Sequence, residues 1–206
     1  TANPGTYDVN SAIVDELIWN YGITCCIAAG NANSNNNYYI TNPALAYNAI
    51  TVGAGNSRYE IYNTDCYDEH TNVDKPTIVS HTDVMYLGEL GATAGTSGGT
   101  AITTGVIAGL MSESPTLKLK PAMVTALITC SSYNIPNVIS YSDSNLSEAY
   151  GAGFLDAEKM NESRINMRYQ TTNSSQGDMS FVFEYEEFFL KGENIRISAC
   201  WLAKSN

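Results

Sequence analysis

One serine stands among small residues in Gly95-Thr96-Ser97-Gly98-Gly99-Thr100-Ala101. A helical pattern follows at once, with apolar side chains at Ile102, Val106, Ile107 and Leu110. Small neighbours leave the serine hydroxyl open to approach, and a helix start offers backbone N–H groups and a positive dipole end to nearby negative charge. By itself such a glycine-rich string is more often an ordinary loop. Ser97 is therefore a candidate nucleophile whose meaning depends on the rest of the chain.

Composition limits the classes of protein. The 206 residues are 44% hydrophobic and 15% charged, which is enough for one sizeable core. The net charge is −11, with only ten Lys and Arg, so we expect no binding to nucleic acid, which needs clustered basic residues. No apolar run approaches the roughly 18 residues of a membrane helix, so we expect no membrane segment. We also expect no cofactor and no metal.

The chain alternates helical and strand-like patterns up to about residue 160. A helix is predicted from a cap at Asn10 or Ser11 to a stop at Gly22. Further helices are predicted after Ser97, where Ala108 and Gly109 would permit close packing of a buried helix, and from Pro121. Strands are predicted at 23–29, 49–53 and 77–79. This order predicts an α/β fold with a parallel β-sheet flanked by helices.

Beyond Asn161 the pattern changes to strict alternation, at residues 179–183 and 195–199. Alternation of this kind is typical of antiparallel strands with one face in water. We therefore predict two units: residues 1–161, and residues 162–206 as the start of an antiparallel β-sandwich domain.

Two groups of residues have less specific interpretations. The five cysteines lack metal-binding spacing, and Cys25 and Cys26 would point to opposite faces of one strand, so small buried side chains are predicted. Four of the carboxylates within residues 56–75 match no calcium template, so an exposed loop is favoured over a calcium site. The four are Asp65, Asp68, Glu69 and Asp74.

Acyl transfer needs a nucleophile, a base with an orienting group, and donors for the developing oxyanion. Ser97 meets the first need. Asn31 follows the predicted strand that ends in Ala28-Ala29-Gly30, and a side-chain amide at a strand's carboxyl end projects into the crevice where α/β sheets bind ligands. Asn31 is thus a candidate oxyanion donor, the alternative being an ordinary turn residue.

Five motifs fall in the order and spacing of the subtilisin-like serine peptidases, which residues 10 to about 160 resemble. They are Ala28-Ala29-Gly30-Asn31; Asn42-Pro43-Ala44 with Asn48-Ala49-Ile50-Thr51-Val52-Gly53-Ala54; Lys75-Pro76; Gly95-Thr96-Ser97; and Tyr150-Gly151-Ala152-Gly153-Phe154-Leu155-Asp156-Ala157. The resemblance implies that Ser97 is the nucleophile, that Asn31 stabilises the oxyanion, and that Ala28, Ala29 and Gly30 line the pocket for a polypeptide substrate's side chain. It also favours an extracellular or cell-surface protein, although the sequence leaves the compartment open.

The sequence departs from this family in informative ways. The Asp and His motifs that members carry upstream of this region are missing, so we expect the chain to begin inside a catalytic domain. Ala101 stands where the family usually has Pro after the serine motif, and Ser80-His81-Thr82 stands where it usually has Ala-Pro-Gly. Neither His70 nor His81 matches the catalytic position, and Asp156 is interpreted as a helix-start residue.

These observations leave two functions open. The first is a serine endopeptidase, present here as a fragment that is inactive alone. The second is a pseudo-peptidase or protein-binding module on the same scaffold. In either case we expect self-association of the fragment through an unpaired sheet edge and exposed apolar surface.

Overall fold

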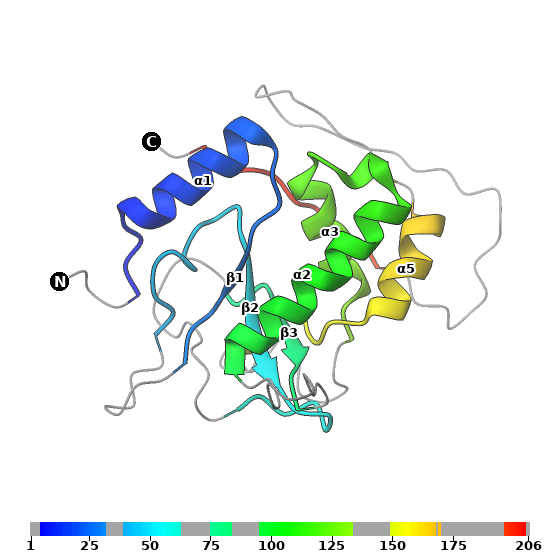
Figure 1. Cartoon of the computed structure of the whole chain (residues 1–206), viewed down its shortest axis with the longest axis horizontal. Helices are drawn as coiled ribbons and strands as arrows, with labels where there is room; N and C mark the ends of the chain where they lie inside the picture. Colours follow the sequence, from blue (N-terminus) through cyan, green and yellow to red (C-terminus); the bar gives the residue numbers. More distant parts are fainter. Residues whose placement is uncertain are drawn as a thin grey trace, which may run out of the picture.

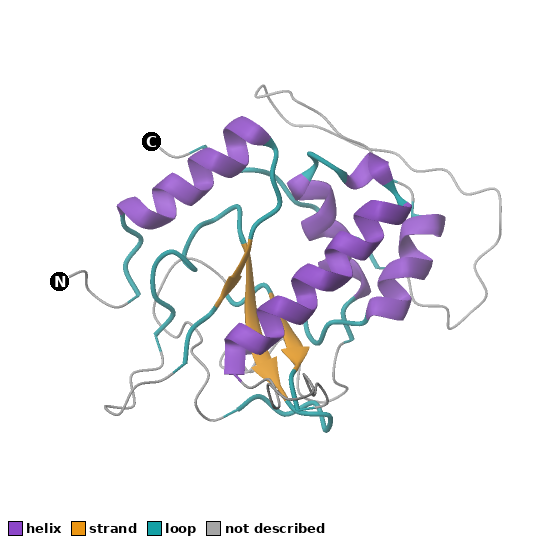
Figure 2. Ribbon diagram, in the orientation of Figure 1, coloured by secondary structure: helices purple, strands orange, loops and turns teal. Residues whose placement is uncertain are grey.

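The computed structural model describes residues 5–31, 39–62, 75–83, 95–133, 149–167, 169 and 196–204. Within them, three parallel strands form one sheet in the order β1-β2-β3, with helices around it (Figures 1 and 2). The strands are β1 (Cys26–Ala28), β2 (Ile50–Gly55) and β3 (Ile78–His81). The predicted parallel sheet with flanking helices is confirmed in this part of the chain.

The central strand is β2, and all six of its residues are buried. Cys26 of β1 aligns with Ile50, and Val52 aligns with Ile78 of β3. Because β2 has a strand on each edge and α2 (Gly95–Glu113) packed against it, its residues are apolar or small apart from Thr51, rather than alternating between apolar and polar. Strand β1, by contrast, is only half-buried over its whole length.

Opposite faces of the sheet pack against different helices. Cys26 and Ile50 join a core cluster with Ile107 and Leu110 of helix α2 (Gly95–Glu113). Cys25 and Ile27 pack instead with Ile18 of helix α1 (Val9–Tyr21). Side chains alternate along a strand, so α1 and α2 cover opposite faces, and the prediction that Cys25 and Cys26 point apart is confirmed.

The ends of α1 are set by local hydrogen bonds. Asp8 is the N-cap, and its carboxylate accepts from Asn10 N and Ser11 N, so the predicted cap at Asn10 or Ser11 was wrong by two to three residues. The carboxylate reaches backbone N–H groups two and three positions ahead, as an Asp N-cap does. Gly22 ends the helix in the left-handed conformation, as predicted.

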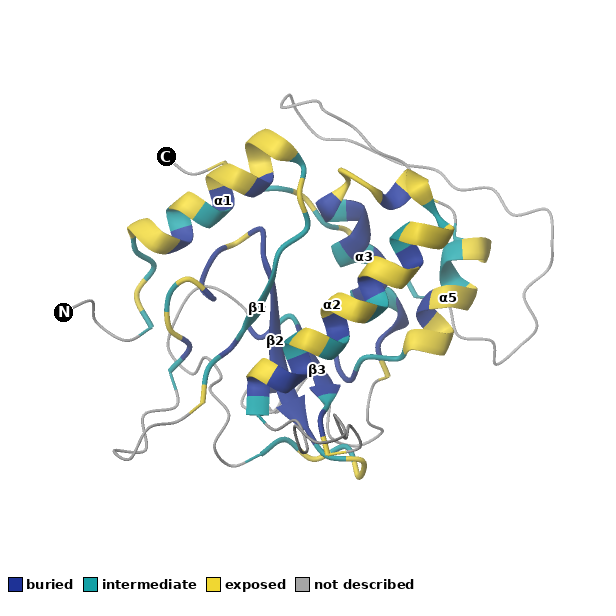
Figure 3. Ribbon diagram, in the orientation of Figure 1, coloured by how far each residue is buried: buried dark blue, intermediate teal, exposed yellow. Residues whose placement is uncertain are grey.

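Helix α2 starts earlier than predicted and is packed differently. It begins at Gly95, so Ser97 lies in its first turn rather than in a preceding loop. Ala108 and Gly109 are exposed, and the prediction that they allow close packing of a buried helix was wrong. The close approach occurs at Gly99, where an added Cβ would lie 2.8 Å from the Gly53 carbonyl oxygen. Figure 3 shows that only one side of α2 is buried.

The remaining helices close one end of the core. The 3₁₀ helix η2 (Pro115–Leu117) leads to α3 (Pro121–Ser131), which has the predicted proline in its first turn. Helix α3 packs against α5 (Ala157–Asn166). Asp156 caps α5 by accepting from Lys159 N at 2.8 Å, which confirms its interpretation as a helix-start residue.

The C-terminal segment, residues 196–204, returns to the start of β2. Its Ala203 exchanges two hydrogen bonds of 2.7 Å with the Asn48 side-chain amide. No strand is assigned within 196–204, so the strand predicted at 195–199 is not found in its described part. The predicted β-sandwich and the boundary at 161/162 stay predictions.

Several other predicted features lie outside the described residues. They are the four carboxylates of the acidic loop, His70, and the alternating segment 179–183. In the described part of the chain, no helix is both long enough and apolar enough to cross a membrane.

We predict opposite effects for two glycine substitutions in α2. Gly99→Ala would place a methyl group against the Gly53 carbonyl and push α2 away from the sheet, which should lower the free energy of unfolding by about 1–3 kcal/mol. Gly105→Ala meets nothing within 4 Å and should raise it by about 0.5–1 kcal/mol, because Gly is the weaker helix former. Urea denaturation of both variants measures the difference; equal effects would contradict this packing.

Candidate active site

The sequence-predicted site residues meet at the carboxyl edge of the sheet. The chain leaves β1 through Ala29 and Gly30 to reach Asn31, and α2 begins over the same edge (Figure 1). Gly99 in the first turns of α2 lies against Gly53 of β2 and Ser80 of β3. Ligands of α/β proteins bind outside this edge of the sheet.

Two hydrogen bonds join the segment after β1 to the start of α2. The backbone N–H of Thr96 donates to Asn31 Oδ1 at 3.2 Å. The backbone N–H of Gly30 donates to Thr96 Oγ1 at 3.1 Å. Thr96 is fully buried, whereas Gly30 is half-buried and Asn31 is exposed, so both bonds are partly shielded from water. The residue immediately before Ser97 is thereby fixed to the residues on either side of the Gly30–Asn31 peptide.

Gly95 makes this approach feasible. Its φ is +65°, a conformation that favours glycine. A Cβ at this position would lie 2.7 Å from Asn31 Oδ1, which is too close for a carbon and an oxygen that are not bonded. Any other residue at position 95 would therefore displace the Asn31 side chain.

The two candidate catalytic groups are both exposed. Ser97 lies in the first turn of α2, and in the part of the chain that the structure describes its hydroxyl makes no hydrogen bond. Asn31 uses Oδ1 to hold Thr96, while its Nδ2 donates to no described residue. The backbone N–H of Ser97 belongs to the first turn, where N–H groups lack partners within the helix. Within the described residues, the side-chain amide of Asn31 and this N–H are thus two available donors, and the Thr96–Asn31 bond joins the segments that carry them.

The predicted substrate-binding residues differ in what they can offer. Ala28 and Gly30 are half-buried. Ala29 is fully buried, its side chain packs with Ile40 and Leu45, and its N–H bonds to the Val52 carbonyl at 3.0 Å. Ala29 can therefore contribute little beyond its carbonyl group to a pocket. Their role in lining a substrate pocket stays a prediction.

The described histidine lies on the far side of the sheet from the serine. Ser80 faces Gly99 of α2, so the next residue, His81, faces the other way. Its Nδ1 lies 2.9 Å from the Asn56 carbonyl oxygen, and its ring stacks on Phe154 with centroids 4.7 Å apart. These contacts agree with the prediction that His81 is a locally bonded residue rather than the base.

Sequence reasoning missed Gly95 and Thr96 as positioning residues. The signal was present, since both precede the serine directly in the quoted motif. Their role could not be derived, because Thr96 acts on residues 30 and 31, which lie 65 to 66 positions away along the chain.

The family of the chain is established by comparison with known proteins. The sequence profile of the subtilase family (peptidase S8) matches residues 2–153 of this chain. The chain therefore belongs to that family, and the resemblance drawn from its motifs is confirmed. A search among curated proteins found no match.

Solved structures agree with the fold. The patellamide maturation protease PatA is 19% identical with a TM-score of 0.62, over 80% of this chain and 59% of that one. The prenylagaramide maturation protease PagA is 19% identical with a TM-score of 0.61, over 78% and 57%. The CspB protease of Clostridium perfringens is 18% identical with a TM-score of 0.52, over 63% and 29%. The chain spans less than two thirds of each of these structures.

We predict that Thr96→Val destabilises the protein although it conserves shape. The substitution removes the acceptor of the Gly30 N–H and leaves a donor unpaired in a half-buried place, at a cost of about 1–3 kcal/mol in the free energy of unfolding. Thr116→Val, on the exposed surface of η2, is the matched control and should change it by less than about 0.5 kcal/mol. Chemical denaturation measures both; an unaffected Thr96→Val would show that the Gly30–Thr96 bond contributes nothing.

Proposed function

We propose that the protein of which this chain is a part is a serine endopeptidase that cleaves polypeptides through an acyl-enzyme at Ser97. Membership of the subtilase family supports a peptidase. The observation that supports the assignment of residues is the bond from Thr96 N–H to Asn31 Oδ1, because it holds the Asn31 side chain at the residue next to Ser97 and leaves Nδ2 without a partner among the described residues.

In the proposed reaction a base removes the proton from Ser97 Oγ as this oxygen attacks the scissile carbonyl carbon. The carbonyl oxygen becomes an oxyanion, which accepts hydrogen bonds from Asn31 Nδ2 and the Ser97 N–H. Collapse of this intermediate expels the amine, which takes the proton from the base, and water then hydrolyses the acyl-enzyme. Pre-placed donors of this kind stabilise the charge only as it develops.

The base and its orienting carboxylate are proposed to come from segments outside this chain. His81 is engaged on the other face of the sheet, and Asp156 caps α5. We therefore expect residues 1–206 alone to be inactive. Ala28, Ala29 and Gly30 are proposed to line the pocket for the substrate side chain that precedes the cleaved bond. We also propose the division into a catalytic portion, 1–161, and a following β-domain, 162–206.

A second function, a pseudo-peptidase or binding module, is favoured by the segment 80–82. Where the family has Ala-Pro-Gly, this chain has Ser80 and Thr82, both fully buried, and the Ser80 hydroxyl has no hydrogen-bond partner in the described residues. The coding sequence upstream of Thr1 distinguishes the two functions. A peptidase requires an Asp motif followed by a His motif there, and their absence would favour the binding module.

We predict that a serine-directed fluorophosphonate labels the full-length protein at Ser97. Ser97→Ala should abolish labelling, whereas Ser112→Ala, at another exposed serine of α2, should leave it unchanged. Asn31→Ala should lower turnover by about 10² to 10³, the magnitude known for such a donor in a subtilisin. Labelling is read by mass spectrometry of peptides. A folded full-length protein that is not labelled at Ser97 would refute the peptidase function.

We also propose that the fragment self-associates through α1. Four side chains at intervals of four residues form an exposed apolar stripe on this helix: Val9, Ile13, Leu17 and Tyr21. Water contact with such a stripe is unfavourable, and a second copy would remove it. Size-exclusion chromatography over a dilution series should show concentration-dependent association that Ile13→Lys weakens and Thr116→Lys does not. A fragment that is monomeric throughout would contradict the proposal.

A further inference from the structure

The opposite edge of the sheet holds a buried cation that has no ion-pair partner among the described residues. Lys75 directly precedes the β3 region and is 5% exposed. Its Nζ donates to the Ala49 carbonyl at 2.6 Å and to Thr77 Oγ1 at 3.4 Å. In the described residues no carboxylate lies within 4.0 Å of this ammonium. An ammonium removed from water without a counter-ion is costly, so this arrangement calls for compensation.

The carboxylate of Asp15 does not supply this compensation. Asp15 of α1 is 1% exposed, and its oxygens accept from Tyr47 N, Asn48 N and Tyr7 Oη at 2.7 to 3.0 Å. Burial lowers the pKa of Lys75 from 10.5 to about 8, and Asp15 offsets only part of this shift. The charge of Asp15 is thus already satisfied by other donors.

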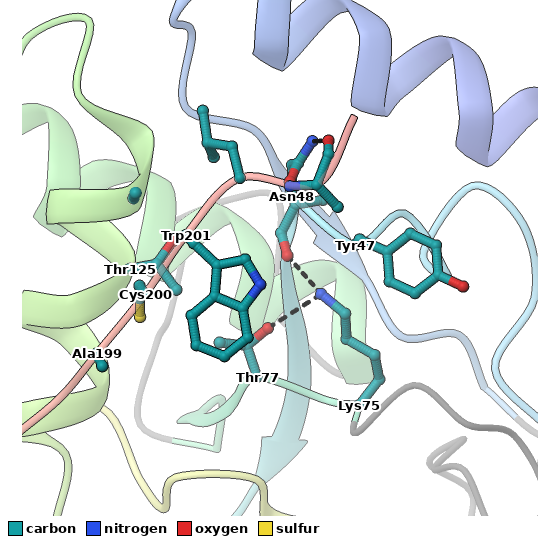
Figure 4. Close-up of a pocket in the computed structure, with 12 residues that line it drawn as sticks. Tyr47, Asn48, Lys75, Thr77, Thr125, Ala199, Cys200 and Trp201 are labelled. Carbon is teal, nitrogen blue, oxygen red and sulfur yellow. Dashed lines mark hydrogen bonds between the residues drawn. The ribbon is translucent and has the colours of Figure 1, made fainter. Parts of the chain in front are cut away.

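Lys75 lines a cavity of about 290 Å³. In the view of Figure 4 the Lys75 amine lies between Trp201 and Tyr47, two exposed residues that line this cavity. The wall includes Ala122 and Thr125 of α3 and Leu202 of the C-terminal segment. The volume is at the small end of ligand pockets and the walls are largely apolar.

Two further features favour an anion here. Thr125 lines the cavity, and its hydroxyl makes no hydrogen bond within the described residues. Ala122 lies in the first turn of α3, an 11-residue helix whose unpaired N–H groups and dipole favour negative charge. The Lys75 ammonium, the Thr125 hydroxyl and the start of α3 can together stabilise a group with a single negative charge. A doubly charged group is disfavoured by Asp15 and by the net charge of −11.

We propose that this cavity binds a small monocarboxylate with an apolar body, its carboxylate on Lys75 and its hydrocarbon part between Trp201 and Tyr47. The site lies at the amino ends of β2 and β3, whereas Ser97 and Asn31 lie beyond the carboxyl ends. It does not depend on the proposed peptidase function. It requires the C-terminal segment, which supplies Trp201 and Leu202 and is held by the Asn48–Ala203 pair.

The test uses the 206-residue chain and benzoate as the probe, with benzamide as the neutral analogue of the same shape. Calorimetry should show saturable binding of benzoate and at least tenfold weaker binding of benzamide. Lys75→Met should weaken benzoate binding at least tenfold. Lys204→Met removes an exposed charge next to the cavity-lining Ala203 and should leave the affinity unchanged. Equal affinities for benzoate and benzamide, or an effect of Lys204→Met as large as that of Lys75→Met, would overturn the proposal.

Proton uptake on binding distinguishes a direct contact with Lys75 from non-specific electrostatic attraction of benzoate. At pH 9 most Lys75 amines are neutral, so benzoate binding should take up about one proton per site, seen as a dependence of the binding heat on the buffer. The titratable groups around the cavity are Lys75, Asp15 of α1, Tyr47 and Cys200, since the lining residues of α3 carry no charge. Binding at pH 9 without proton uptake would refute contact with Lys75.

Two further measurements test the proposal if Lys75→Met does not fold. Thr125→Val keeps Lys75 and should still weaken benzoate binding severalfold, and the comparison of benzoate with benzamide needs no variant. If Lys75→Met does fold, its free energy of unfolding should lack the increase with pH that wild type shows. The unfolded wild-type chain retains the Lys75 proton up to about pH 10.5 and the folded chain only to about pH 8, so wild type gains stability relative to Lys75→Met between these values.

Discussion

The geometry of this protein depends on the close contact between the first turns of α2 and the carboxyl edge of the sheet. Gly99 approaches the Gly53 carbonyl so closely that no Cβ fits between them, and Gly95 does the same against Asn31. These two glycines, four residues apart, therefore determine how closely the first turns of α2 approach the sheet and Asn31. Because Ser97 lies between them on the same turn, its position follows from backbone packing rather than from contacts of its own side chain.

The two ends of the sheet use polar groups in contrasting ways. At the carboxyl edge, Thr96 satisfies a neighbouring N–H group with its hydroxyl and gives its own N–H to Asn31, so the exposed groups keep their capacity to bind something else. At the amino edge, Asp15 is buried and saturated with donors, while Lys75 donates to one carbonyl and one hydroxyl and has no ionic partner among the described residues. Saturated buried groups hold the fold together, and an unsaturated one marks a place where a ligand lowers the energy.

Much of the fold could be predicted because its signals are local. The strands at 50–55 and 78–81 are short apolar runs, and Gly22, Pro121 and Asp156 mark helix ends by their own backbone chemistry. The α1 cap was misplaced by two to three residues, and the other errors arose where the outcome depends on distant residues. Ala108 and Gly109 have the small size that permits close packing, but the sheet lies against Gly99 instead. The candidate site was found from the motif and the family resemblance, whereas the Thr96 bonds and the Lys75 cavity join segments that only folding brings together.

The pairing of Ala203 with Asn48 has a mechanical consequence. Both bonds run to one side-chain amide at the start of β2, and further contacts from Arg196 and Ser198 reach the end of α3. Tension applied to the chain beyond residue 204 would load the Asn48 amide first, and through it the buried central strand. A force applied at this point would therefore act on β2 before it could unwind α5.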